Sequence, residues 1–412
     1  MSKKILLIIG LVATSQIATA ALWKVFTTAS SIDSTHLDGS QVIAIEFDND
    51  GSVWMGTTSY GILHFKPWNY QWNRYNDTTT NFQLPFSEVR AIALDNDGSK
   101  WFGTKAGLIH RVGDDFTVHT TSNSTLPSNK INVLRKASDG TIWVGTDNGI
   151  MKISGGQWTT INTGNSGLPD NNISSLEFSG TNAWIGTYNK GIVRFDGTNY
   201  TAFNVSTGDF YSNQIYSIGI YGDAVLARVA EHISLYQNGV WDTISTDTNI
   251  IGLPNIYNRR IVVDQSGNFW TEHGGVGLQS FNSGIFTLYT FDNSGLGDAR
   301  VFCINVDNHN TVWIGNNGGK LSLFNPAGIP QFVQGIEDDS KLIKANIFPN
   351  PITDLLNIEV PPETTISVYD AYGKLISQSQ DKTQNTADWK QGVYFIEVEK
   401  GELRSRKKFV KI

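Results

Sequence analysis

One tryptophan position recurs along most of the chain and constrains the fold more than any other feature. At intervals of 41 to 47 residues, apart from one interval of 86, it is occupied by Trp54, Trp101, Trp143, Trp184, Trp270 and Trp313. The long interval spans two units, and its missing member falls at Leu226. Self-similarity at such a period indicates a repeat architecture, in which one unit cannot bury its hydrophobic face alone. The sequence therefore predicts seven copies of one unit.

Each copy has the pattern of four short strands. A turn such as Asp48-Asn-Asp-Gly51 precedes the tryptophan, and a glycine, as at Gly56, stands two residues after it. A second apolar strand such as Gly61-Ile-Leu-His-Phe65 follows, and then an outer strand that carries a large aromatic residue. The content of 40 glycines and 12 tryptophans, with only 17% charged residues, suits many short strands joined by turns. Four strands in about 43 residues predict the blade of a β-propeller.

The outer strand also indicates how the ring closes. Six units carry its aromatic signature, whereas the seventh ends at Phe324 without one. The signature appears instead near the N-terminus, as Trp23-Lys-Val-Phe26. We therefore predict that this N-terminal strand completes the last blade and removes a free sheet edge. The single cysteine, Cys303, excludes an intramolecular disulfide and is expected to be a buried, inert thiol.

The first 20 residues have the pattern of a secretory signal peptide. Lys3 and Lys4 precede the apolar run 5–12, and Ala18-Thr-Ala20 offers a cleavage site. The apolar run is too short to cross a bilayer of about 30 Å, and we expect no transmembrane segment in the mature chain. The formal net charge is −7, without a basic cluster in the main body. A nucleic-acid partner is therefore not expected.

The sequence changes character near residue 326. Strand-like alternation resumes near residue 345, as in Ile366 with Val368 and Tyr394 with Ile396. We expect a signal peptide over 1–20, a propeller over 21–325, a linker over 326–344 and a compact C-terminal unit over 345–412. The predicted fold class is all-β, with a seven-bladed β-propeller closed by an N-terminal strand and followed by a small immunoglobulin-like β-sandwich.

Several ordered motifs mark the C-terminal unit. They include the Pro-Asn-Pro opening, and the positions concerned are Pro349, Asn350, Pro351, Gly373, Gly392, Tyr394, Lys408 and Lys411. With these motifs the unit resembles the type A sorting domain of the type IX (Por) secretion system of Bacteroidetes. The resemblance implies an address that binds the secretion machinery through residues 345–412, and a passenger that is secreted or held on the cell surface. An ordinary immunoglobulin-like binding module would show the same strands without the Pro-Asn-Pro opening.

The repeat itself also resembles a known family. Residues 89–104, which end in Trp101-Phe-Gly-Thr104, show most fully the pattern of the two-component regulator propeller repeat. In that family such propellers often form the extracytoplasmic part of membrane sensors, many of them linked to glycan sensing. No kinase or response-regulator segment follows the ring here, so the resemblance implies the fold and a binding habit but not a sensor role.

Units five and six depart from the repeat and supply the candidate site. Arg228 and Glu272 stand where glycine is expected, with Glu231 and His273 close by and Arg259 and Arg260 on the connection between the units. The loop face of the ring is expected to bind a glycan or protein ligand through Tyr188, Lys190, Arg228, Glu272 and His273.

Three alternatives to this site remain open. A propeller-fold lyase or hydrolase would use Glu272 and His273 with a metal, although neighbouring residues of a strand point to opposite faces. A structural surface protein would lack a pocket, and a degenerate blade would carry only solvated charges. We predict no catalytic residue, metal or cofactor. The Asp-rich turns are interpreted as hairpins rather than calcium loops, and Trp68 and Tyr70 lie outside the repeat.

Overall fold

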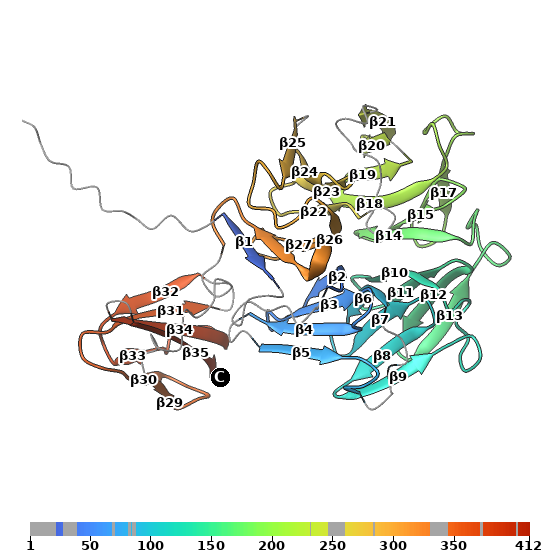
Figure 1. Ribbon diagram of the computed structural model, residues 1–412. Helices are drawn as coiled ribbons and strands as arrows, with labels where there is room; N and C mark the ends of the chain where they lie inside the picture. Colours follow the sequence, from blue (N-terminus) through green and yellow to red (C-terminus); the bar gives the residue numbers. More distant parts are fainter. Residues whose placement is uncertain are drawn as a thin grey trace, which may run out of the picture.

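The computed structural model describes the following residues of the 412-residue chain: 22–27, 39–67, 71–80, 84, 88–230, 232–245, 260–282, 285–329, 345–370, 374–400 and 403–412. In these ranges the fold is all-β, with one short 3-10 helix, η1 (Asn317–Gly319). Seven four-stranded antiparallel sheets form the blades of a propeller (Figure 1). The predicted signal peptide and the linker residues 330–344 lie outside the described ranges.

The first two strands of each sheet lie nearest the centre of the ring. The innermost strands are β2 (Val42–Phe47), β6 (Val89–Leu94), β10 (Ile131–Lys136), β14 (Ile173–Ser179), β18 (Ile215–Tyr221), β22 (Val262–Val263) and β26 (Val301–Val306). The second strands, which carry the repeated tryptophan position, are β3 (Val53–Thr57), β7 (Lys100–Thr104), β11 (Ile142–Thr146), β15 (Asn182–Thr187), β19 (Ala224–Val229), β23 (Phe269–His273) and β27 (Val312–Asn316).

The third and fourth strands form the outer part of the ring. The third strands are β4 (Ile62–Lys66), β8 (Leu108–Val112), β12 (Gly149–Ser154), β16 (Ile192–Phe195), β20 (His232–Gln237), β24 (Gly277–Asn282) and β28 (Leu321–Phe324). The outermost strands are β5 (Gln71–Tyr75), β9 (Asp115–His119), β13 (Gln157–Ile161), β17 (Tyr200–Phe203), β21 (Val240–Ser245), β25 (Ile285–Thr290) and β1 (Trp23–Phe26).

The N-terminal strand closes the ring, as the sequence predicted. β1 pairs antiparallel with β28, from Trp23 opposite Phe324 to Phe26 opposite Leu321. Figure 1 shows this blue strand beside the orange strands of the last blade. Phe26 is fully buried and meets Phe65 of the first blade at a ring distance of 5.5 Å. The closure therefore joins the last blade to the first through side chains as well as through backbone pairing.

The Asp-rich turns are hairpins that also hold the tryptophans. Asp48 N donates to Ser52 O at 2.8 Å, and Gly51, at φ 81°, donates to Asp48 O at 2.9 Å. This positive φ is the conformation that favours glycine. The indole N–H of Trp54 donates to Asp48 Oδ2 at 3.2 Å, and Trp270 and Trp313 bond in the same way to their own turns. The six repeated tryptophans are all buried, which confirms their interpretation as core residues.

The glycine two residues after the tryptophan is where neighbouring blades meet. A Cβ atom on Gly103 would lie 2.5 Å from Ile131 Cγ2 of the next inner strand, and one on Gly145 would lie 2.8 Å from Ile173 Cγ2. Any larger side chain would push these blades apart unless the next blade were changed as well. The repeated glycine is thus a packing requirement of the ring.

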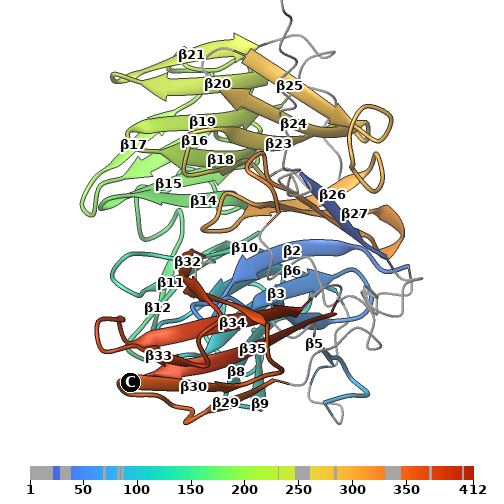
Figure 2. The same cartoon turned by 90° about the vertical axis from the view of Figure 1, so that its left-hand side faces the viewer.

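The C-terminal strands form a unit of their own, which Figure 1 shows at one side of the ring and Figure 2 shows in front of it. One sheet has the order β29-β30-β33 and the other β32-β31-β34-β35. The strands are β29 (Asn346–Phe348), β30 (Leu355–Glu359), β31 (Thr365–Asp370), β32 (Leu375–Ser379), β33 (Thr383–Asn385), β34 (Gly392–Lys400) and β35 (Leu403–Lys411). Both sheets contribute to one apolar cluster, for example through Ile358 and Val368, as in a β-sandwich.

Cys303 lies on β26 inside the propeller core and is 4% exposed. Its thiol donates to Val42 O at 3.2 Å, and burial raises its pKa to about 12. The thiol is therefore protonated and inert, as predicted. In the described ranges, no helix has the length and apolar character needed to cross a bilayer.

Candidate functional site

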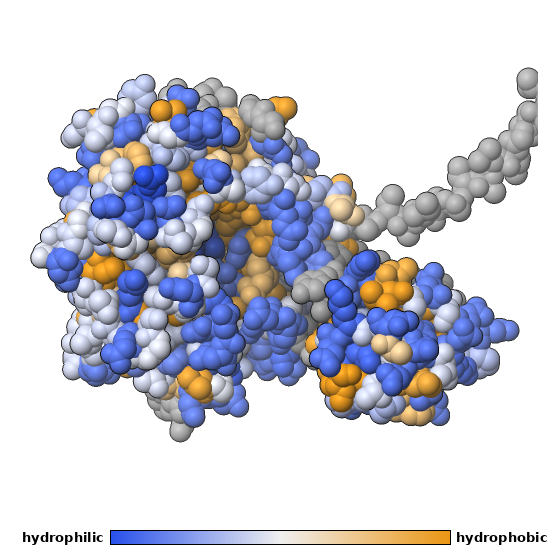
Figure 3. All heavy atoms as spheres, turned by 180° about the vertical axis from the view of Figure 1, so that it is seen from behind, coloured by the Kyte–Doolittle hydropathy of each residue, from blue (hydrophilic) through white to orange (hydrophobic). Residues whose placement is uncertain are grey.

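A cavity of about 180 Å³ lies at the centre of the propeller and is lined by residues of every blade's inner strand or of the connection leading to it. Figure 3 shows the ring hollowed at its centre. The wall contains small and apolar side chains such as Ala91 and Val133, but also three arginines, Glu46 and two tyrosines. A space of this size accommodates several waters or one small organic molecule.

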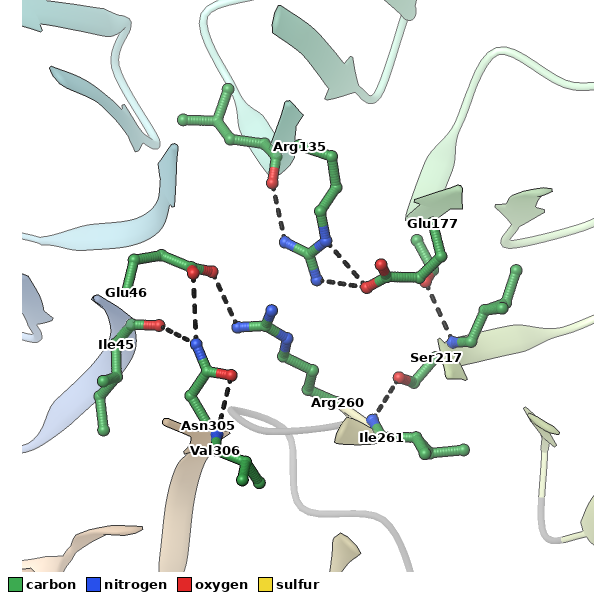
Figure 4. A network of polar contacts seen from close by, with 12 residues as sticks. Ile45, Glu46, Arg135, Glu177, Ser217, Arg260, Ile261, Asn305 and Val306 are labelled. Atoms are coloured by element: carbon green, nitrogen blue, oxygen red, sulfur yellow. Dashed lines mark hydrogen bonds and ion pairs between the residues drawn. The ribbon is translucent and has the colours of Figure 1, made fainter. Parts of the chain in front are cut away.

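Arg135 and Glu177 form one ion pair at this cavity, from the neighbouring strands β10 and β14 (Figure 4). Arg135 donates from Nε and Nη2 to Glu177 Oε1 at 2.8 and 2.7 Å, and from Nη1 to Leu134 O at 2.7 Å. The two side chains are 16% and 23% exposed. The pair is therefore fixed by short, charge-assisted bonds, and Arg135 lines the cavity.

Arg260 and Glu46 form a second pair across the ring. Arg260, which precedes β22 in the sixth blade, donates from Nη1 to Glu46 Oε1 on β2 at 3.1 Å. Asn305 on β26 donates to Glu46 Oε2 at 3.2 Å and to Ile45 O at 2.8 Å. Three blades thus meet in one network, and Arg260 reaches past the seventh blade to the first.

The charge of Arg135 affects the pKa of Arg260. Burial lowers the pKa of Arg260 and the nearby charge of Arg135 lowers it further, although Glu46 and Glu177 oppose both effects. Burial also works to lower the pKa of Arg135, but Glu177 and then Glu46 outweigh it and raise that pKa. Both groups stay protonated, since an arginine is charged at any physiological pH. Two like charges therefore lie close together between two carboxylates.

A third arginine belongs to the same wall. Arg90 Nε lies 2.6 Å from Glu88 Oε1, and Lys105 Nζ lies 2.8 Å from Glu88 Oε2. Burial works to raise the pKa of Glu88, but the hydrogen bonds from Lys105 and Arg90 outweigh it and lower that pKa. Tyr188 and Tyr216 also line the cavity, as do Asn132 and three serines.

The structure does not bring the five predicted ligand residues together. Arg228 on β19 and Glu272 on β23 are both fully buried, with Arg228 Nη1 3.1 Å from Glu272 Oε1. Arg228 Nη1 also lies 3.2 Å from Glu272 O and 3.4 Å from Thr271 Oγ1. The two charges therefore do not face the loop surface as expected, because both side chains are buried and pair with each other between the fifth and sixth blades.

The other predicted residues are dispersed. His273 is buried at the end of β23, whereas Lys190 is exposed in the loop after β15. Of the five, Tyr188 lines the central cavity. Glu231, Arg259, Trp68 and Tyr70 lie outside the described residues. Within those residues, no three His, Cys, Asp or Glu side chains gather as metal ligands would.

The motifs at the two ends of the C-terminal unit meet in space. Asn350 Oδ1 accepts from Val410 N at 2.9 Å, and Ile352 N donates to Val410 O at 2.7 Å. The ammonium group of Lys411 donates to Thr353 O and lies 3.7 Å from Asp354. The opening that contains Pro349 and Pro351 is therefore bonded along the closing strand β35.

The remaining motif residues of this unit occupy its larger sheet. Gly392 begins β34, and Tyr394 is buried on the same strand, where its ring stacks on Phe409 and its hydroxyl donates to Lys390 O at 2.8 Å. Lys408 pairs with Phe395 through the backbone of β35. Gly373 lies outside the described residues.

The sequence interpretation above did not predict the arginine pairs at the cavity, although the repeat carries a signal for them. Opposite the repeated tryptophan the inner strand carries Ala93 in the second blade and Val262 in the sixth. The same register position carries Glu46, Arg135 and Glu177 in three other blades. In the seventh blade this position carries Asn305, so charged and amide side chains at one strand position mark the centre of the ring.

Fold and geometry together define a seven-bladed β-propeller followed by a β-sandwich. Residues 346–412 match the model of the family described as "Secretion system C-terminal sorting domain". Residues 36–59 and 125–148 match the model described as "Two component regulator propeller". In its propeller the chain thus carries repeats of the two-component regulator type, and its C-terminal unit is a secretion system C-terminal sorting domain. A search of curated proteins gives no match.

Several solved structures share the propeller fold. The extracellular domain of a hybrid two component system from B. thetaiotaomicron is 19% identical, with a TM-score of 0.60 over 95% of this chain and 57% of that one. The chain thus spans little more than half the length of that relative. Virginiamycin B lyase from Staphylococcus aureus is 16% identical, with a TM-score of 0.57 over 74% of this chain and 99% of the lyase. At these identities the likeness establishes the fold alone.

Proposed function

We propose that the protein is a secreted or cell-surface binding protein whose propeller holds a small ligand, or the end of a glycan, in its central cavity. The observation that carries this proposal is the polar wall of the cavity. Arg90, Arg135, Arg260 and Glu46 come from four different blades and converge on one space of about 180 Å³. Concave sites with a few convergent polar groups are the usual places for ligand binding.

The sorting domain supports the first half of the proposal. Its family model covers residues 346–412, and its opening and closing motifs form one bonded edge. We infer that this domain directs the propeller through the type IX secretion machinery to the cell surface or the medium. A propeller delivered there meets ligands of the surroundings, such as glycans or surface proteins.

The lyase or hydrolase alternative gains no support from the geometry of its expected residues. Glu272 is fully buried against Arg228, and His273 is also buried. An acid–base pair must reach the proton that it transfers, and these two side chains do not open to the cavity wall. Binding is therefore the function that the described geometry favours.

The test combines a ligand screen with a cavity-filling variant. A panel of neutral and acidic mono- and disaccharides is screened against the full chain by ligand-detected NMR. Ser174 lines the cavity, so Ser174→Trp should abolish the signal of any ligand bound there. Ser206 lies exposed in a connecting loop, and Ser206→Trp serves as the matched control. Equal binding by both variants, or a panel without any hit, contradicts the proposed cavity site.

A further inference from the structure

The inner strands of the propeller share an irregularity at the wall of the central cavity. In six blades the pairing of the first strand with the second shifts after the first residue, which leaves the second residue of the inner strand without a partner position. Such a bulge bends the strand and re-aims a side chain. The six bulge residues are Ile43, Arg90, Asn132, Ser174, Tyr216 and Phe302. All of them except Phe302 line the cavity.

The strand positions around the bulge are nearly uniform, whereas the bulge residues differ from blade to blade. In these six strands the first residue is always valine or isoleucine, and the fourth is always isoleucine or leucine. The bulge position instead carries apolar, cationic, amide, hydroxyl and aromatic side chains. The fold therefore requires no particular side chain there, and a variable position in the wall of a cavity is suited to matching a ligand.

The polar bulge residues lie on three successive blades, the second to the fourth. Asn132 Nδ2 donates to Ile173 O at 2.8 Å, which places this amide beside the next bulge, at Ser174. Among the described residues, nothing donates a hydrogen bond to Asn132 Oδ1. An amide oxygen accepts hydrogen bonds, so Asn132 contributes an acceptor to the cavity wall.

Arg90, on the blade before Asn132, supplies donors to the same wall. Its Nε donates to Glu88 Oε1 at 2.6 Å, and Lys105 Nζ lies 2.8 Å from Glu88 Oε2. Glu88 thus holds one edge of the guanidinium group in place. In the described part of the chain, the terminal groups Nη1 and Nη2 of Arg90 have no hydrogen-bond or ion-pair partner, and the side chain is 29% exposed. Their N–H groups are therefore open to a ligand in the cavity.

An aromatic ring lies at the same end of the cavity as the bulges. The backbone N–H of Tyr188 donates to Asn172 O at 3.0 Å, two residues before Ser174, and Tyr188 lines the cavity. A sugar ring has apolar C–H faces and an edge of hydroxyl groups. A wall with an aromatic side chain and a few placed polar groups suits both parts of such a ring.

We propose, resting on the cavity site of the proposed function, that Arg90 and Asn132 are the residues that select the ligand, and that they bind two neighbouring hydroxyl groups of one sugar unit. One hydroxyl accepts a hydrogen bond from a terminal N–H of Arg90, and the next hydroxyl donates to Asn132 Oδ1. An epimer in which one of these two hydroxyls is inverted cannot form both bonds in the same orientation. The pair therefore distinguishes sugars that differ at a single carbon.

The experiment measures this discrimination between epimers. Methyl α-D-glucoside, methyl α-D-galactoside and methyl α-D-mannoside are titrated by calorimetry into the full chain. The galactoside differs from the glucoside only at C4, and the mannoside differs from it only at C2. We expect the preferred glycoside to bind at least about tenfold more tightly than the weakest one, which corresponds to about one net hydrogen bond.

Two variants assign the selection to the bulge residues. Asn132→Ala removes the acceptor, and Arg90→Gln removes the guanidinium while Glu88 keeps Lys105. Each should weaken binding of the preferred glycoside about tenfold and reduce its advantage over the weakest epimer to less than about threefold. A merely structural disturbance would weaken all three glycosides alike and leave their ratio unchanged.

Each variant has a matched control outside the cavity. Asn148 is exposed and donates to Pro127 O, so Asn148→Ala removes a similar side-chain bond away from the site. Arg300 is exposed near Asp298, and Arg300→Gln removes a guanidinium there. Both controls should bind the glycosides like the parent chain. Circular dichroism and the melting temperature of each variant establish that it is folded.

The outcomes separate this inference from the proposed function. If a glycoside binds and Ser174→Trp abolishes its binding, but Asn132→Ala and Arg90→Gln keep the discrimination of the parent chain, the cavity site stands and the selecting role of the bulge residues is overturned. If Ser174→Trp leaves binding unaffected, the cavity site is wrong and this inference fails with it. If the three glycosides bind equally, or if none binds, the selection of a sugar by Arg90 and Asn132 is overturned.

Discussion

Two kinds of arginine–glutamate pair occur in this propeller, and their surroundings give them opposite roles. The pair of Arg228 and Glu272 is fully buried between the fifth and sixth blades. The pairs at the ring centre, such as Arg135 with Glu177, keep 16–27% of each side chain exposed. A fully buried charge is stabilised by its partner alone, because water cannot reach it. A partly exposed charge can also be solvated by water. The same kind of pair is therefore part of the packed interior at one place and borders an open cavity at the other.

The largest effect is expected from breaking the buried pair. Glu272→Gln removes the carboxylate charge that lies 3.1 Å from the buried guanidinium of Arg228, and we expect a loss of about 3–5 kcal/mol in the free energy of unfolding. Chemical denaturation followed by tryptophan fluorescence measures this loss. The double variant Arg228→Met/Glu272→Leu removes both charges and should recover most of the stability. A double variant as unstable as Glu272→Gln would show that the pair contributes more than mutual compensation.

A second prediction concerns His64, a buried histidine that would carry a charge without an ion-pair partner if it were protonated. The ring of His64 stacks on Trp54 at 4.0 Å, and in the described part of the chain its Nε2 has no hydrogen-bond partner. Burial lowers the pKa of His64 from 6.5 to about 4. Between these pH values His64 is protonated in the unfolded chain but not in the native protein. The free energy of unfolding should therefore fall by about 3 kcal/mol as the pH drops from 6.5 to 4.

The variant His64→Phe isolates this contribution from that of the other histidines. It keeps an aromatic ring against Trp54 and cannot titrate. Its stability relative to the parent chain should therefore improve steadily as the pH falls through that window, as measured by urea denaturation at pH 7, 6, 5 and 4. Parallel curves for the two proteins would mean that His64 is protonated in the native state.

The smallest effect on stability is expected at the ring centre. Glu177→Gln keeps the shape of the side chain and removes its charge, while Arg135 can turn to water in the cavity. We expect a change of less than about 1 kcal/mol in the free energy of unfolding, as for other partly exposed ion pairs. The measurement is the same denaturation experiment as for Glu272→Gln. A loss of 3 kcal/mol or more would mean that the central pairs are structural and would erase the distinction between the two kinds of pair.

The fold could be predicted because its determinants are local and repeated. The turn at Asp48 to Gly51 and the strand around Trp54 recur with few changes. The closing strand at Trp23 could be predicted because its sequence resembles that of the outer strands. The same turns set the strand register locally, because a hairpin turn fixes which residues lie opposite each other. The buried thiol of Cys303 was equally evident from its apolar strand.

The site was harder to predict because it is built from contacts between blades. Arg228 and Glu272 were interpreted one at a time as exposed departures from the repeat. Their separation of 44 residues, about one repeat, places them on neighbouring blades, where the two side chains meet. Arg260 was predicted to be a charge on the connection between two blades. Its partner Glu46 lies on the first blade, and the sequence pattern does not show that these two residues meet in space.

The pairing of β1 with β28 joins segments that are separated by nearly the whole propeller sequence. It is therefore a contact of very large sequence separation. The entropy lost in closing this loop is compensated only when all seven blades are in place. A chain truncated before Leu321 would leave β1 without its partner strand. The last blade can therefore form fully only in a chain that contains every other blade. It directly precedes the segment that leads to the sorting domain.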